Sequence, residues 1–217
     1  MKTRILLADD HRIMREGLAA LLERQPDMEV IQQASDGLQA VSVSRDLTPD
    51  VAVMDVTMPG MNGIEATRRI TKEVPGVKVL CLSVHGDTRV VSGVLDAGAS
   101  GYLLKDCAFE ELVTAIRTVV AHKTYLSPGI AGTLVDDYKA RRTAPASSAC
   151  RELTEREREI VQLLAEGLST KEIGERLHLS VKTVGTHREH LMAKLHVQSL
   201  AQLTKYAIRE GLTSVET

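Results

Sequence analysis

Five polar side chains that could act together stand where apolar segments of the first half of the chain end. Asp9 and Asp10 follow "RILLA", Asp55 ends "VAVMD", Ser83 lies in "VKVLCLSV", and Lys105 follows "GYLL". Parallel strands deliver their carboxyl ends to one crevice, so these ends would gather three carboxylates, a hydroxyl and an ammonium. Like charges held this close require a compensating cation, and carboxylate oxygens suit Mg²⁺. The pattern therefore predicts a magnesium site.

The same set of residues predicts chemistry on a phosphoryl group. A carboxylate beside bound Mg²⁺ can act as a nucleophile, and Asp55 is the candidate because an apolar strand delivers it. Ser83 and Lys105 could take up charge on the transferred oxygens. A pair such as Asp9 and Asp10 alone is typical of a helix start, so the interpretation depends on the combination with the later strand ends.

The elements that must position these residues alternate regularly. Short apolar segments predict strands at residues 4–8, 29–34, 51–55, 77–84 and 101–105, and amphipathic segments such as 12–25, 63–74 and 109–123 predict helices between and after them. Strict alternation of strand and helix is typical of a parallel sheet with helices on both faces. We therefore predict a doubly wound α/β domain with five parallel strands over residues 1–123.

Composition limits the class of protein. The chain has 217 residues, of which 43% are hydrophobic and 26% charged, so one full-sized domain and a second small one are expected. The sequence contains no apolar stretch of membrane-spanning length and no signal peptide, which predicts a cytoplasmic protein. The three cysteines and the histidines, His11 among them, lack metal-ligand spacing and are expected to be reduced thiols and solvated imidazoles.

The second half of the chain changes character. Residues 124–150 are predicted to form a linker, with one short helix near residues 129–141 and an exposed connector at 142–150. Residues 151–217 are predicted to hold four short helices. Their start signals are capping boxes or N-caps, and their stop signals are glycines: Thr154 with Glu157, Ser169 with Glu172, Ser199 with Gln202, Ser180, Gly167 and Gly211.

The third of these helices has the features of a DNA-reading helix. Val181, Val184, Leu191 and Leu195 are the predicted buried positions, and the polar residues between them would be exposed. The order helix, turn, helix, short turn, longer helix predicts a helix-turn-helix. Residues 151–217 carry ten basic and ten acidic residues, so affinity for DNA should come from this helix alone and be modest for a monomer.

Four segments of the first half resemble the receiver domain of two-component response regulators: "LLADDHRIMREGL", "DVTMPGMNGIEA", "VLCLSVH" and "GYLLKD". The resemblance implies that Asp55 is the phosphoacceptor, that Ser83 and Lys105 contact the phosphoryl group, and that Tyr102 is an aromatic switch. It further implies that Mg²⁺ is held by Asp9, Asp10 and Asp55 with the backbone carbonyl of Thr57. A partner histidine kinase would be the phosphodonor. Thr57 and His85 occupy positions that vary in the family and influence hydrolysis of the phosphoryl group.

The second half resembles the LuxR-type helix-turn-helix in "LTEREREIVQLLAEG", "KEIGERL", "KTVGTHREHLMAKL" and "YAIREGL", so the whole chain is similar to NarL/FixJ-type response regulators. The resemblance implies binding to double-stranded DNA, with a homodimer when phosphorylated. Gly185, Thr186 and Glu189 would face the groove. The remaining predicted contacts lie nearer the backbone or add donors: Lys182, Thr183, His187, Arg188 and Lys194. Coupling through dimerisation and coupling through release of the recognition helix both stay open.

Alternatives from other classes have weaker support. A phosphatase with an aspartate nucleophile needs a second carboxylate nearby as acid-base catalyst, but position 57 is threonine. The C-terminal helices could instead be a protein-interaction module, which a gel shift on genomic fragments would distinguish. An FMN-binding domain would place the cofactor phosphate in an acidic crevice that repels it.

Overall fold

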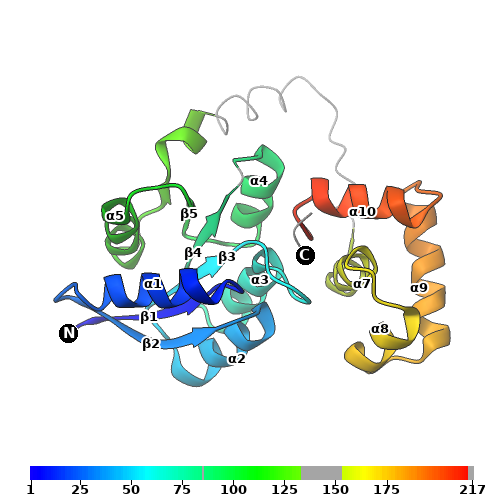
Figure 1. Cartoon of the computed structure of the whole chain (residues 1–217), viewed down its shortest axis with the longest axis horizontal. Helices are drawn as coiled ribbons and strands as arrows, with labels where there is room; N and C mark the ends of the chain where they lie inside the picture. Colours follow the sequence, from blue (N-terminus) through cyan, green and yellow to red (C-terminus); the bar gives the residue numbers. More distant parts are fainter. Residues whose placement is uncertain (85, 133–152, 215–217) are drawn as a thin grey trace. The chain divides into compact units, whose positions relative to one another are not determined.

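A computed structural model describes residues 1–84, 86–132 and 153–214 of the chain. The chain divides into two compact units, Met1–Thr143 and Ala144–Thr217 (Figure 1). The predicted domain boundaries at residues 123 and 150 remain predictions. The connector at 142–150, most of the helix near 129–141, and His85 lie outside the described residues. Among those that are described, no helix is both long and apolar enough to cross a membrane.

The first unit is built on a parallel sheet, which confirms the predicted α/β class. All neighbouring strands are parallel, and their order is β2-β1-β3-β4-β5-β6. The described strands are β1 (Thr3–Ala8), β2 (Met28–Ala34), β3 (Val51–Asp55), β4 (Lys78–Ser83), β5 (Gly101–Leu104) and β6 (Tyr125–Leu126). The sheet thus has six strands rather than the predicted five.

The sixth strand begins in the segment that was predicted to be linker. Tyr125 pairs with Gly101 and Leu126 with Tyr102, and the backbone N–H of Ser127 donates to the carbonyl of Tyr102 at 3.0 Å. The buried hydroxyl of Ser127 donates to Glu111 at 2.8 Å and accepts from the backbone N–H of Leu104 at 3.3 Å. Residues 128–132 then continue as helix. Two residues are too few to show the alternation that predicts a strand.

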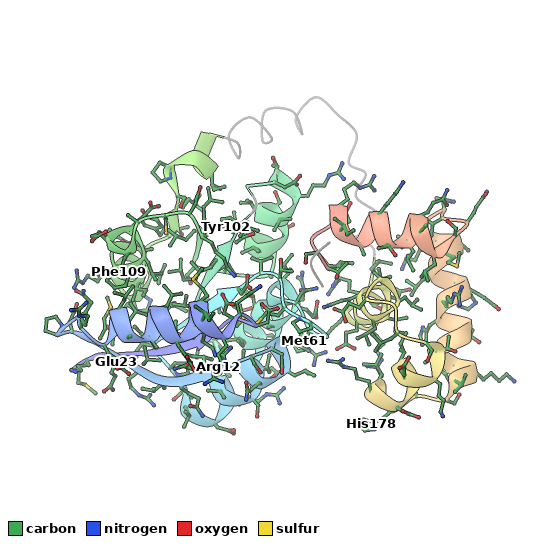
Figure 2. All side chains as sticks on the ribbon, in the orientation of Figure 1. Arg12, Glu23, Met61, Tyr102, Phe109 and His178 are labelled. Atoms are coloured by element: carbon green, nitrogen blue, oxygen red, sulfur yellow. The ribbon has the colours of Figure 1, made fainter. Side chains whose placement is uncertain are left out.

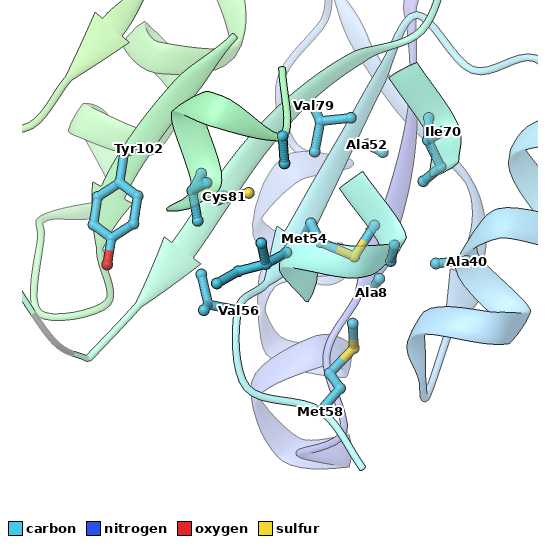
Figure 3. Packing of buried hydrophobic residues seen from close by; sticks show 14 of the residues in the cluster. Ala8, Ala40, Ala52, Met54, Val56, Met58, Ile70, Val79, Cys81 and Tyr102 are labelled. Atoms are coloured by element: carbon cyan, nitrogen blue, oxygen red, sulfur yellow. The ribbon is translucent and has the colours of Figure 1, made fainter. Parts of the chain in front are cut away.

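Helices cover both faces of this sheet. They are α1 (Arg12–Leu22), α2 (Gly37–Leu47), α3 (Gly63–Glu73), α4 (Thr88–Asp96) and α5 (Phe109–Val120). Alternate residues of each strand point to opposite faces, so Leu6 joins the core beneath α2, α3 and α4 whereas Ile5 joins the core beneath α1 and α5. Figure 3 shows Met54, Cys81 and Tyr102 in the first of these cores.

The second unit consists of four described helices around one apolar core: α7 (Glu155–Ala165), α8 (Thr170–Leu177), α9 (Val181–Lys194) and α10 (Leu200–Arg209). The capping boxes at Thr154 and Ser169 and the N-cap at Ser180 are confirmed. Gly167 and Gly211 adopt φ values of 89° and 70°, as expected after a helix end.

The third predicted capping box, that of Ser199 with Gln202, forms only in part. Ser199 accepts from the backbone N–H of Gln202, but the Gln202 side chain accepts from the backbone N–H of Gln198 at 2.7 Å. Gln198 lies one residue before the N-cap, so the glutamine side chain satisfies a different donor from the one that a capping box pairs.

Candidate functional site: an acidic pocket and a recognition helix

The predicted acidic residues lie together at the carboxyl end of the sheet. Asp9 follows β1 and Asp55 ends β3, and both are 3% exposed. The ammonium of Lys105, which follows β5, lies 2.9 Å from Asp9 Oδ2 and 2.8 Å from Asp55 Oδ2. The topology therefore brings residues almost 100 positions apart into direct contact, with one lysine between two buried carboxylates.

Burial is the largest single influence on the pKa of both Asp55 and Lys105. It raises the pKa of Asp55 to about 6, although the nearby charge and hydrogen bond of Lys105 act in the opposite direction. Burial also disfavours the charged form of Lys105, but the carboxylates of Asp55 and Asp9 outweigh it, so the pKa of Lys105 is raised. The pocket thus holds a carboxylate that is largely ionised at neutral pH beside a fixed positive charge.

A close approach of backbone positions Asp55. The N-cap Asn62 starts α3, and the backbone N–H of Gly63 donates to the carbonyl of Val56 at 2.8 Å. A Cβ atom on Gly63 would overlap the carbonyl oxygen of Asp55, so a glycine is required here. In the intervening loop the backbone N–H of Thr57 donates to Asp55 Oδ1 at 3.2 Å, which orients the carboxylate. The predicted metal contact of the Thr57 carbonyl remains a prediction.

Ser83 and Tyr102 form the neighbouring part of the pocket. Ser83 ends β4 and is 2% exposed, and the Tyr102 side chain on β5 is fully buried. The two side chains share a hydrogen bond, but burial dominates and raises the pKa of the Tyr102 hydroxyl to about 12. Tyr102 therefore occupies an inward position that points to Ser83. Figure 3 shows its ring beside β4.

The donor atoms of the pocket fit a hard divalent cation. Asp10 Oδ1 is shielded from solvent, accepts no hydrogen bond and has Nδ1 of His11 as its ion-pair partner at 2.9 Å. Burial of three carboxylates in one pocket is costly unless cations compensate their charge. Ligand atoms of Asp9, Asp10, His11 and Asp55 all lie within 4.8 Å of one another. Three of these four residues were predicted. His11 was expected to be solvated, and its place in the cluster depends on the turn that follows β1, which residue spacing does not reveal.

The helix-turn-helix comprises α8 and α9. The turn between them begins at His178, which has a left-handed φ of 54° (Figure 2). A Cβ on Gly174 would lie 2.8 Å from the carbonyl oxygen of Leu179, so α8 can approach this turn closely. Val184 and Leu191 of α9 are fully buried as predicted, and these contacts fix which face of α9 is exposed.

The exposed face of α9 differs from the prediction at two positions. Val181 was expected to be buried but is 51% exposed, because the first turn of α9 extends beyond the core. The ammonium of Lys194 lies 3.0 Å from Glu157 of α7, so its nearest charge partner is within the domain. The hydroxyls of Thr183 and Ser180 lie 2.8 Å apart at the N-cap.

The remaining predicted DNA contacts are accessible to different degrees. Lys182, Thr186 and Glu189 are exposed, and Gly185, His187 and Arg188 are half-buried. The Thr186 hydroxyl donates to the carbonyl of Lys182 at 3.1 Å, and the residue is exposed. Gly185 has open space where a Cβ would lie. This face thus offers a lysine, an arginine, a hydroxyl and a carboxylate near Gly185, which itself has no side chain.

Comparisons with known proteins cover both units. The response regulator receiver domain matches residues 5–117, and the bacterial regulatory proteins of the LuxR family match residues 151–207. The oxygen regulatory protein NreC of Staphylococcus carnosus is 39% identical over 213 residues, 96% of this chain and 98% of NreC.

Solved structures give the same picture. A LuxR family two-component response regulator from Aurantimonas sp. SI85-9A1 is 39% identical, with a TM-score of 0.61 over 64% of this chain and 99% of that chain. The response regulator RcsB in its complex with DNA is 25% identical, with a TM-score of 0.60 over 96% of this chain and 99% of that chain. Similarity therefore extends across both units.

Proposed function

Because the chain belongs to the two-component response regulators that join a receiver domain to a LuxR-type DNA-binding domain, we propose that Asp55 receives a phosphoryl group and thereby controls DNA binding by α9. Proteins of this kind are phosphorylation-dependent transcription regulators and not metabolic enzymes. The observation that carries the proposal is the buried Asp55 carboxylate, held between Lys105 and the acidic residues after β1.

The phosphodonor in this proposal is a phosphohistidine on a partner kinase. An oxygen of Asp55 attacks phosphorus, the P–O bond forms as the P–N bond breaks, and the leaving imidazole takes a proton from water and departs neutral. Lys105 already contacts Asp55 and can stay beside the phosphoryl oxygens as they gain charge. Asp9 and Asp10 would hold Mg²⁺, which supplies charge neutralisation at the transferred phosphoryl group.

Ser83 and Tyr102 are the proposed relay from the pocket. Ser83 shares a hydrogen bond with Tyr102. Once phosphoryl oxygens are present at Asp55, they would compete with Tyr102 for the Ser83 hydroxyl. A switch acts only through contacts that differ between two states, and exchange of this hydrogen bond is such a difference. Dimerisation and release of α9 are both compatible outputs of the change.

DNA recognition is proposed for the exposed face of α9. Lys182 and Arg188 would neutralise phosphates, whereas Thr186 and Glu189 would meet base edges in the major groove. Lys194 is left out of this surface because its ammonium contacts Glu157. Support comes from the similarity to RcsB, whose structure contains DNA, and a pair of chains on two half-sites would offset the neutral charge of the domain.

The phosphoryl acceptor can be tested by mass spectrometry. With Mg²⁺ and a small acyl-phosphate donor, the full chain should gain one phosphoryl group, and Asp55→Asn should gain none. Asp46→Asn is the matched control, because Asp46 is an exposed carboxylate on α2. Labelling of Asp55→Asn, or labelling that persists after chelation of the metal, would overturn the proposed site.

DNA binding should be measured on the same samples. Genomic fragments selected by the phosphorylated wild-type chain should bind it more tightly than the unphosphorylated chain, and Asp55→Asn should not respond to the donor. Equal affinity with and without phosphorylation would remove the proposed control of α9.

A further inference from the structure

Arg15 on α1 joins two neighbouring strand ends at the edge of the acidic pocket. Its Nη1 donates to the backbone carbonyl of Asp9 at 2.6 Å, and its Nε donates to the side-chain oxygen of Gln33 at 3.2 Å. Asp9 follows β1, and Gln33 lies near the end of β2, which pairs with β1. The half-buried guanidinium therefore links β1 to β2 where the acidic residues begin.

This contact completes the anchoring of the Asp9 backbone. The N–H of Asp9 donates to the carbonyl of Ala34 on β2 at 3.2 Å, and the carbonyl of Asp9 accepts from Arg15. Both hydrogen bonds lead to the end of β2, because Gln33 precedes Ala34 and holds Arg15. The side chain of His11, the N-cap residue of α1, makes no capping hydrogen bond. Arg15 thus fixes a turn whose following helix starts without a side-chain cap.

Arg15 holds the main chain of Asp9 and leaves its carboxylate to other partners. Oδ2 of Asp9 accepts from Lys105 at 2.9 Å, and Oδ1 accepts from the backbone N–H of His11 at 2.7 Å. Residues that orient a metal ligand without touching the ion commonly change metal affinity by roughly 10- to 100-fold when they are replaced. Because Asp10 follows Asp9 in the same turn, a fixed Asp9 backbone also limits where the Asp10 carboxylate can lie.

We propose that Arg15 is a positioning residue that preorganises Asp9 and Asp10 to bind Mg²⁺. The inference rests on the proposed function, because it concerns the metal that phosphorylation of Asp55 requires. A guanidinium carries its donors in fixed directions, so Nε and Nη1 reach two acceptors at once. A lysine ammonium keeps the charge but cannot reproduce this two-point contact, so Arg15 acts through geometry as well as charge.

The experiment titrates Mg²⁺ into the full chain, followed by amide NMR, and measures phosphorylation by a small acyl-phosphate donor on the same samples. Arg15→Gln should weaken Mg²⁺ binding about tenfold. Its phosphorylation rate at saturating Mg²⁺ should stay within about twofold of wild type, because only metal binding is impaired. Arg15→Lys should weaken Mg²⁺ binding nearly as much as Arg15→Gln.

Arg12→Gln is the matched control. Arg12 lies on the same helix (Figure 2), and its exposed guanidinium contacts Glu16 at 2.7 Å and not the turn after β1. This variant should therefore keep the wild-type Mg²⁺ affinity and phosphorylation rate.

Replacement of Gln33 tests the two-point contact. Gln33→Ala removes the acceptor of Arg15 Nε and should weaken Mg²⁺ binding less than Arg15→Gln does. The double variant should bind Mg²⁺ no more weakly than Arg15→Gln alone, because both substitutions disrupt the same contact. Additive losses would show that the two residues act separately and would overturn the proposed link.

Three further results would overturn the positioning role of Arg15. Wild-type Mg²⁺ affinity in Arg15→Gln, even with lower stability of the metal-free chain, would show a purely structural role. Wild-type affinity in Arg15→Lys would show that the charge alone is sufficient. A phosphorylation rate that stays low at saturating Mg²⁺ would show that Arg15 acts on the chemical step and not through metal binding.

Failure of this inference can be distinguished from failure of the proposed function. A wild-type chain whose Mg²⁺ affinity depends on Arg15 but that accepts no phosphoryl group would support the positioning role and contradict the function. Phosphorylation of Asp55 in the wild-type chain, together with equal Mg²⁺ affinity in Arg15→Gln, would do the reverse.

Discussion

The acidic pocket and the exposed face of α9 are fixed by different kinds of constraint. The pocket lies at the ends of buried strands, where Asp9, Asp55 and Lys105 contact one another directly. The exposed face of α9 is the side that remains after Val184 and Leu191 are buried, and Lys182, Thr186 and Glu189 are exposed on it. Changes in the pocket should therefore alter stability and chemistry together, whereas changes on the exposed face of α9 should alter recognition with at most a small change in stability.

Two glycines give the largest expected contrast. Gly63→Ala places a Cβ against the backbone of Asp55 and Val56, so we expect a loss of about 3 kcal/mol or more in the free energy of unfolding and loss of phosphorylation. Gly185→Ala meets open space within a helix and should raise stability by ~0.5 to 1 kcal/mol. Urea denaturation of both variants measures the difference. Similar changes at the two sites would contradict the contrast.

Two lysines give the next largest contrast. Lys105→Ala leaves two buried carboxylates without their shared ammonium, so the metal-free chain should lose about 3 kcal/mol of stability, and Mg²⁺ should restore part of it. Lys194→Ala removes a partly exposed ion pair with Glu157 and should cost less than about 1 kcal/mol. Thermal unfolding with and without Mg²⁺ provides the measurement. A loss of stability for Lys105→Ala no larger than that for Lys194→Ala would contradict the shared role of Lys105 between the two carboxylates.

The pH dependence of stability tests the electrostatics of the pocket. A pKa of Asp55 that rises from 3.8 to about 6 on folding means that the folded chain binds a proton more tightly than the unfolded chain. This carboxyl group therefore lowers stability as pH rises from about 4 to about 6, and its full cost persists above that range.

Removal of this group should reverse the effect. Asp55→Asn should stabilise the chelator-treated chain by roughly 1 to 3 kcal/mol at pH 7, and the gain should shrink towards pH 4. Urea denaturation across this pH range, with Asp46→Asn as control, measures it. A gain that is the same at pH 4 and pH 7 would show that burial of the charge is not the cause.

Substitution of the exposed residues Glu189 and Lys182 on α9 should change stability least, but the two variants should differ in how they change DNA recognition. Glu189→Ala removes an exposed carboxylate that could accept from cytosine N4, so it should relax discrimination at one base pair by ~1 to 3 kcal/mol and raise non-specific affinity. Lys182→Ala should weaken binding to all sequences and reduce the salt slope by about one, and Lys72→Ala in α3 is its control.

Selection from randomised DNA distinguishes these two variants. If Glu189→Ala returned the wild-type motif while Lys182→Ala altered base preference, the proposed orientation of α9 in the groove would be wrong.

The sequence predicted which residues meet in the pocket, but not how every side chain in it is oriented. Strand ends in a parallel sheet meet at one edge, so apolar segments that end in Asp9, Asp55 and Lys105 were sufficient to place these residues together. The ring orientation of His11 was not predictable, because it depends on a turn whose geometry residue spacing does not encode.

On α9 the helical period was correct, but the extent of the core was not. A period of 3.6 residues predicts which side of a helix is apolar, and it cannot tell where neighbouring helices end. Val181 is exposed for this reason, and the contact of Lys194 with Glu157 likewise requires the packing of α7 to be known.

The short strand β6 determines where receiver and DNA-binding modules can be exchanged between regulators. A chimera spliced at residue 123 would remove Tyr125 and Leu126 from β5, leave the backbone of Gly101 and Tyr102 as an uncovered sheet edge, and invite pairing with other chains. It would also delete Ser127, the partner of Glu111. A junction that keeps the receiver intact must therefore lie after β6 and Ser127. The receiver module is thus longer than the repeating pattern of strands and helices suggests.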